Sequence, residues 1–185
     1  MGRRVARGCG RALLFAAASL GFAWLLILAG AVPNPLASPS WLGERALCLS
    51  RIKTLALGTA LYQQDYDGTL PAAGAWSDRI RRYGLAQVGS FDCPGTSGGK
   101  WGYGMNLALD RAPAETIEDP SRVALLFDIR AEEANAFGGP MDLVYRHHFA
   151  GMVACADGHS RRLMAGPRGD TVDWSRPVPR QGKRP

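Results

Sequence analysis

The sequence predicts an α+β protein: an apolar helix near the amino terminus, then one domain in which an amphipathic helix packs on an antiparallel β-sheet. Three observations lead to this prediction. A charge-free apolar run covers residues 12–32, and apolar residues recur with a helical period over residues 41–65. After residue 103, short apolar runs are separated by turn residues. These turns are too brief for parallel crossover connections, which favours antiparallel pairing.

The first apolar run, ALLFAAASLGFAWLLILAGAV, holds 21 residues without a charge. As a helix rising about 1.5 Å per residue it is long enough for the roughly 30 Å hydrocarbon layer of a membrane. It is preceded by Arg3, Arg4, Arg7 and Arg11. We therefore expect residues 1–11 in the cytoplasm and the rest outside, in a single-pass inner-membrane topology. A cleaved signal peptide is the alternative, because Ala29-Gly30-Ala31 is an acceptable cleavage site.

The formal net charge of +6 comes from the two ends of the chain. Eight basic residues lie in the end segments, and the residues between carry 14 basic against 16 acidic side chains. Because nucleic-acid binding needs cations clustered on one face, this distribution argues against a nucleic acid as partner. Residues 167–185 are rich in Pro, Arg and Gly, which predicts a disordered basic tail.

The domain is expected to cover residues 41–166, after a proline-rich linker at residues 33–40. Its first helix is predicted over residues 41–65, with Ser40 as N-cap, and it ends at the turn signal before Pro71. A second, short helix is predicted over residues 76–83 and capped by Ser77. Strands are predicted over residues 103–109, 122–129, 141–146, 152–156 and 159–164.

Several motifs follow one another between residues 48 and 164. Residues 48–71 read CLSRIKTLALGTALYQQDYDGTLP, and Phe91-Asp-Cys-Pro94 and Tyr103-Gly-Met-Asn106 come later. The series closes with an H-x9-D-G signature formed by His147, Asp157 and Gly158. In this order the motifs resemble bacterial prepilin-type proteins akin to type II secretion pseudopilins. The resemblance implies a pilin-like fold and a membrane-anchored structural or interaction protein of the cell envelope, associated with type II secretion or type IV pilus-like machinery.

The prepilin peptidase site of that family does not occur in this sequence. Such a site resembles G-F-T-L-I-E, whereas the segments after Gly10 and Gly21 lack both the Thr-Leu context and the acidic residue. We therefore expect neither prepilin processing nor ordinary incorporation into a filament. The expected protein is a pilin-like head on a permanent anchor.

The cysteines follow from the predicted topology. Cys9 precedes the apolar run, so Cys48, Cys93 and Cys155 are the ones expected in an oxidising compartment. Cys155 lies within the apolar run 152–156, where a buried thiol behaves as a small hydrophobe. We therefore predict a disulfide between Cys48 and Cys93. A zinc site is the weaker alternative, because the cysteines lack CxxC spacing.

His147, Asp157 and His159 are the candidate metal ligands, because the turn at Asp157-Gly158 reverses the strand that follows His147. The alternative is structural: Asp157 caps the turn, Gly158 supplies a positive φ and His147 hydrogen-bonds the loop. Secretion pseudopilins often bind calcium in a carboxyl-side loop. The resemblance therefore also implies a structural calcium or other divalent cation, held by carboxylates such as Asp128 and Asp157.

Asp65, Asp67 and Gly68 are interpreted as a helix-ending turn, since the distal Glu of a calcium loop is missing. Residues 95–99 (GTSGG) match the letters GxSxG, but they belong to the Gly/Pro-rich loop around Cys93 and lack the strand-turn-helix context of a nucleophile elbow. The sequence also offers no cysteine in an activating neighbourhood and no phosphate-loop spacing around Lys100. We therefore predict that the protein is not an enzyme. The alternative function is an envelope metal- or ligand-binding module that uses the His147, Asp157 and His159 region.

Overall fold

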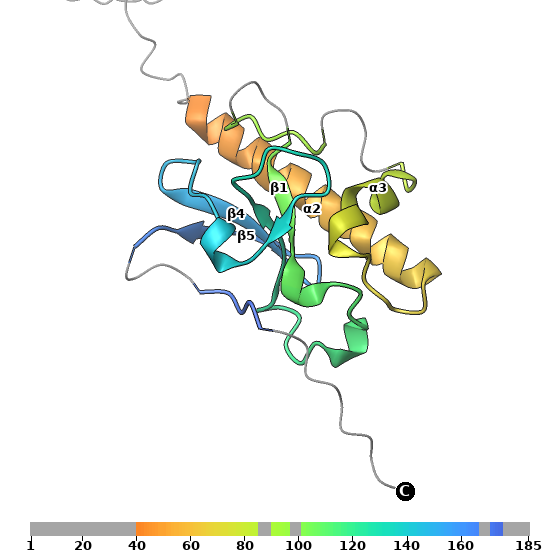
Figure 1. Cartoon of the computed structure of the whole chain (residues 1–185). Helices are drawn as coiled ribbons and strands as arrows, with labels where there is room; N and C mark the ends of the chain where they lie inside the picture. Colours follow the sequence, from red (N-terminus) through yellow and green to blue (C-terminus); the bar gives the residue numbers. More distant parts are fainter. Residues whose placement is uncertain (1–39, 85–89, 97–100, 167–170, 176–185) are drawn as a thin grey trace, which may run out of the picture. The chain divides into compact units, whose positions relative to one another are not determined.

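A computed structural model of the chain describes residues 40–84, 90–96, 101–166 and 171–175. It contains a long helix, α2 (Ser40–Asp65), a short helix, α3 (Trp76–Arg81), and a five-stranded sheet. Helix α2, orange in Figure 1, lies along one face of the sheet. The predicted α+β class and the packing of a helix on a sheet are confirmed.

The predicted segments 1–11 and 12–32, and all of the predicted linker except Ser40, lie outside the described residues. Within the described part of the chain, neither helix combines the length and the apolar character that crossing a bilayer requires.

The strand order is β3-β1-β2-β4-β5. The strands are β1 (Tyr103–Asn106), β2 (Ala124–Asp128), β3 (Phe137–Gly138), β4 (Ala150–Cys155) and β5 (Ser160–Met164). The pairings β1 with β2, β2 with β4 and β4 with β5 are antiparallel, as predicted. The two-residue strand β3 corrects the prediction, because it pairs in parallel with β1. It is held there by the carbonyl of Ala136, which accepts hydrogen bonds from Met105 N and from Trp76 Nε1.

Two predicted strands differ from the structure. The strand from residue 103 stops at Asn106, because its side chain accepts a hydrogen bond from Ala108 N and starts a 3₁₀ turn. Residues 141–146 are not a strand. A 3₁₀ turn at Pro140–Asp142 is closed by the hydrogen bond from Gly139 N to the Asp142 carboxylate, so only Leu143 forms an isolated bridge, to Ile129.

The core has two layers because both faces of the sheet are apolar. Between α2 and the sheet, Ile52 and Leu55 pack in one cluster with Met105 and Met152. A second cluster on the opposite face contains Phe127, Ile129, Val153 and Leu163.

Residues 171–175 help to cover that second cluster. Asp173 bridges Val123, and Trp174 packs edge-to-face on Phe127 with ring centroids 4.8 Å apart. The prediction of a disordered tail from residue 167 is therefore wrong for these five residues. Their apolar side chains remove a buried face of the sheet from water.

The helix boundaries have local causes. Helix α2 begins at Ser40, and it ends where Asp67 and Gly68 adopt φ of 50° and 74°. Gly68 N donates to the Gln63 carbonyl at 2.8 Å, which confirms the predicted helix-ending turn. Helix α3 also forms, but Ser77 does not cap it. The Asn135 side-chain oxygen accepts hydrogen bonds from the backbone N–H of the two residues after Trp76, at 3.0 and 3.2 Å.

Candidate metal centre

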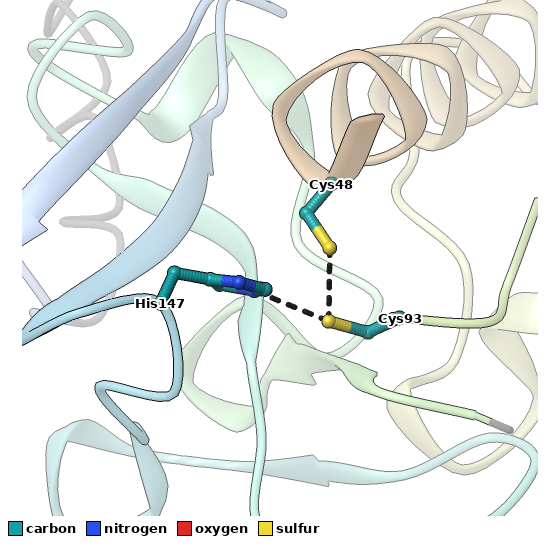
Figure 2. Close-up of side chains that lie close together, drawn as sticks. All are labelled: Cys48, Cys93 and His147. Carbon is teal, nitrogen blue, oxygen red and sulfur yellow. Dashed lines mark hydrogen bonds between the residues drawn. The ribbon is translucent and has the colours of Figure 1, made fainter. Parts of the chain in front are cut away.

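Cys48, Cys93 and His147 converge in the interior of the domain, as Figure 2 shows. The Cys48 and Cys93 sulfurs are 2.9 Å apart, and the Cys93 sulfur lies 3.2 Å from His147 Nε2. All three potential ligand atoms lie within 4.8 Å of one another. Both cysteines are 0% exposed and His147 is 3% exposed, so water has almost no access to the cluster.

Helix α2 positions the cluster through three residues spaced by three. Cys48 lies on its buried face, with Arg45 one turn before and Arg51 one turn after. Arg45 donates to the carbonyls of His147 and His148, at 2.9 and 2.8 Å. Arg51 donates to the Asp92 carbonyl at 2.6 Å. The helix therefore supplies one thiol and holds the two segments that supply the other side chains.

The segment around Cys93 is a tight turn beside the sheet. The backbone N–H and the hydroxyl of Thr96 both donate to the Cys93 carbonyl, at 3.0 and 2.8 Å. Gly102 lies directly against this turn, since a Cβ at that position would stand 2.4 Å from Cys93 Cβ. Gly102 N also donates to the Phe91 carbonyl at 3.2 Å. Only a residue without a side chain fits there, which fixes the place of the Cys93 sulfur.

His147 is directed inward by a two-residue turn that leads into β4. His147 and Ala150 exchange backbone hydrogen bonds of 3.0 and 3.2 Å, and His148 and Phe149 between them have φ of 49° and 61°. Two successive left-handed residues other than glycine are uncommon, and such strain occurs often at functional sites. A Cβ on Gly95 would stand 2.9 Å from His147 Cε1, so the imidazole is confined from that side as well.

Asp128, at the end of β2, is the acidic neighbour of the cluster. Its Oδ2 accepts a hydrogen bond from Met152 N at 2.8 Å and lies 3.4 Å from His147 Nε2, whereas Oδ1 has no hydrogen-bond partner. Burial raises the pKa of this carboxyl group to about 7. Burial alone would lower the pKa of His147, but the hydrogen bond to Cys93 and the charge of Asp128 raise it overall.

The pKa values of the two thiols, Cys48 and Cys93, are shifted in opposite directions. The hydrogen bond with Cys93 lowers the pKa of Cys48 against the effect of burial. The same hydrogen bond, together with burial, raises the pKa of Cys93.

The predicted metal set of His147, Asp157 and His159 does not come together, and this corrects the sequence-based expectation. His147 precedes β4 and Asp157 follows it, and the six residues of that strand span about 20 Å. At the far end, Asp157 Oδ1 accepts from His159 N at 3.1 Å and lies 2.6 Å from His159 Nδ1. Gly158 there has a φ of 89°. The structural interpretation is confirmed for Asp157 and Gly158. The His147 side chain lies against Cys93 instead, and among the predicted ligands only Asp128 lies beside it.

Cys48 and Cys93, which the sequence predicts to form a disulfide, lie close together, but both are free cysteines in this structure. A disulfide bond is about 2.05 Å long, shorter than their 2.9 Å separation. The disulfide therefore stays a prediction that the proximity of the sulfurs supports. Cys155 is free and buried as well.

Sequence reasoning missed that His147 joins the cysteine pair and that Arg45 and Arg51 hold it. One signal was available: Arg45, Cys48 and Arg51 share a spacing of three, which places them near one another on a helix. The proximity of His147 to the cysteines had no sequence signal, because 54 residues separate it from Cys93.

The cluster combines two thiols, an imidazole and a carboxylate in an enclosed space. These groups can form a disulfide or bind a metal ion, and their burial keeps both sulfurs away from a substrate. Comparison of the chain with protein-family models, with curated proteins and with solved structures finds no match.

Proposed function

We propose that this chain is a non-enzymatic, membrane-anchored, pilin-like structural protein of the bacterial cell envelope. In this proposal the outer face of α2 binds a helix of a type II secretion or type IV pilus-like machinery protein. The sequence resemblance and the helix-on-sheet architecture support the pilin-like part. The observation that carries the interaction is the apolar character of α2 on the side turned away from the sheet.

Three leucines are exposed on that outer face: Leu42 is 43% exposed, Leu47 44% and Leu57 51%. At about 100° per residue they lie within an arc of roughly 140°, and at about 1.5 Å per residue they extend over roughly 22 Å. Exposed Gly43, Ala46 and Ser50 lie on the same arc. Lys53 is the charged residue there within residues 42–57, all of which the structure describes.

A helix that is apolar on both sides is typical of a helix packed between two layers. The inner side of α2 packs on the sheet, so its outer side requires a partner to leave water. Small residues beside leucines allow a second helix to approach closely. The burial of both thiols also supports a structural role, because a nucleophile at 0% exposure cannot reach a substrate.

A photo-crosslinking amino acid at position 57 of the full chain, in native membranes, tests this proposal. We expect an adduct with one envelope protein that mass spectrometry identifies as a pilin-like or secretion-machinery component. The matched control is position 141, where Met141 is 87% exposed and lies away from α2 in the Pro140–Asp142 turn. Equal adducts at both positions, or none at position 57, would contradict the proposal.

The double variant Leu47→Glu/Leu57→Glu extends the test. Because both side chains are exposed, the free energy of unfolding is expected to stay within about 0.5 kcal/mol of that of the parent protein. The adduct formed from a neighbouring position on the same face, Ala46, is expected to disappear. Met141→Glu leaves that adduct unchanged.

A further inference from the structure

We infer that the reduced chain binds one Zn²⁺ ion between Cys48, Cys93 and His147, with Asp128 as the fourth ligand. This site is separate from the outer face of α2 and does not depend on the function proposed above. It differs from the cation site that the sequence predicts, because it excludes Asp157 and His159 and requires both thiols.

The types of ligand atom favour zinc. Zn²⁺ binds thiolate sulfur, imidazole nitrogen and carboxylate oxygen, usually four together in a structural site. Calcium takes six to eight oxygen ligands, and this cluster offers one carboxylate. Four ligands from the protein leave no open position, which agrees with the burial of the cluster and with a structural rather than a catalytic ion.

Some of the distances between the proposed ligand atoms are already close to what a tetrahedral ion needs. Cys48, Cys93 and His147 form the close group, and Asp128 lies beside it, next to His147. With Zn–S near 2.3 Å and Zn–N or Zn–O near 2.0–2.2 Å, ligand atoms stand about 3.4–3.8 Å apart. His147 Nε2 and Asp128 Oδ2 are already 3.4 Å apart, and His147 Nε2 and the Cys93 sulfur are 3.2 Å apart. The two sulfurs, at 2.9 Å, need to separate by about 1 Å, which is within the reach of a small side-chain rotation.

A second observation points independently to a cation. Asp128 is 0% exposed and its Oδ1 has no hydrogen-bond partner, although buried carboxylates normally satisfy both oxygens. A positive ion bound by both oxygens of this carboxylate would give Oδ1 a partner and compensate the cost of burying the charge. His147 turns the same nitrogen, Nε2, toward both Cys93 and Asp128, so one ion can bind all three groups.

The ion would connect four segments that are distant in sequence. Cys48 belongs to α2, Asp128 ends β2, Cys93 belongs to the turn at residues 93–96, and His147 to the turn before β4. Arg45 and Arg51 already join α2 to two of these segments through hydrogen bonds. Bound zinc therefore fixes α2 to the sheet and is expected to raise the stability of the domain.

The zinc site and the predicted disulfide exclude each other. When a diazene oxidant takes one proton and one electron from each thiol, it becomes the hydrazine and the Cys48–Cys93 bond forms. Both thiolate ligands are then lost, and two ligands remain. The oxidised chain is expected to bind zinc at least 100-fold more weakly.

The test uses the full chain in detergent with Cys9→Ser and Cys155→Ser, so that the only thiols belong to the site. The protein is reduced with a phosphine, stripped with a chelator and titrated with Co²⁺. We expect one Co²⁺ per chain, with sulfur-to-cobalt charge-transfer bands in the near ultraviolet and visible bands of tetrahedral cobalt. One equivalent of Zn²⁺ abolishes these bands, whereas Ca²⁺ does not.

Two variants identify the ligands. Asp128→Asn retains the shape of the side chain and is expected to weaken Co²⁺ binding about tenfold while keeping the charge-transfer bands. Cys93→Ser is expected to halve those bands. Because Cys93→Ser could impair folding, the deciding readout is the spectrum of the parent protein itself. Absence of one-to-one binding, or cobalt bound without charge-transfer bands, would overturn the inference.

Discussion

Two identical substitutions at different glycines are expected to change stability in opposite directions. In Gly102→Ala the new Cβ would stand 2.4 Å from Cys93 Cβ and 3.1 Å from Thr96 Cγ2. The backbone cannot move away easily, because Gly102 accepts a hydrogen bond from Ile129 N and donates one to Phe91. Overpacking of this kind costs about 1–3 kcal/mol. Gly43 lies in α2 with nothing within 4 Å of the same Cβ, so Gly43→Ala is expected to stabilise by about 0.5–1 kcal/mol.

Urea unfolding followed by tryptophan fluorescence measures both changes in one protein. A slope of about 2 kcal/mol per molar urea converts these energies into midpoints that differ by roughly 1–2 M between the variants. Gly102→Ala is also expected to weaken Co²⁺ binding, because the displaced Cys93 sulfur no longer meets Cys48. If Gly102→Ala unfolds at or above the parent midpoint, the close packing described for the Cys93 turn is wrong.

Three further predictions concern other parts of the domain. Burial raises the pKa of Cys155 to about 11, so its alkylation at pH 8 should follow global unfolding; rapid labelling of the folded protein would contradict its burial. Because the folded chain holds the proton of the Cys155 thiol more tightly than the unfolded chain does, the protonated thiol favours the folded state. This contribution to the free energy of unfolding is lost as pH rises from about 9 to about 11. In Asn135→Gly, glycine can adopt the φ of 57° at this position, but the side chain that caps α3 is removed. Thermal unfolding should therefore show a free energy of unfolding lower by about 1–2 kcal/mol. Trp174→Ala should lower the free energy of unfolding by about 2 kcal/mol or more through the lost contact with Phe127, whereas a disordered tail would give no change.

Local sequence patterns predicted most of the elements. The helical period over residues 41–65 gave α2 almost to the residue, since one of its sides must leave water. The Asp67-Gly68 and Asp157-Gly158 turns formed where they were predicted, because their positive φ angles suit these residue types. The failure at residues 141–146 has a local cause that competes with strand formation, the hydrogen bond between Gly139 N and Asp142.

Distances along the chain misled the prediction of the site. His147 and Asp157 are ten residues apart in sequence, but an extended strand between them places them at opposite ends of β4. Conversely, Cys48, Cys93 and His147 are each separated by more than 40 residues and meet within a few ångströms. No local pattern encodes such a meeting, because it depends on how strand pairing and helix docking fold the chain back on itself.

The sequence by itself therefore determined the helix, four of the five strands and the tight turns, and it pointed to the proximity of Cys48 and Cys93. The tertiary structure alone decided that His147 and Asp128 join that pair, that β3 pairs in parallel, and that residues 171–175 cover the second face of the sheet. The physical reason is that hydrophobic period and turn chemistry act over a few residues. The contacts that assemble the site arise only when the buried faces of distant segments pack together.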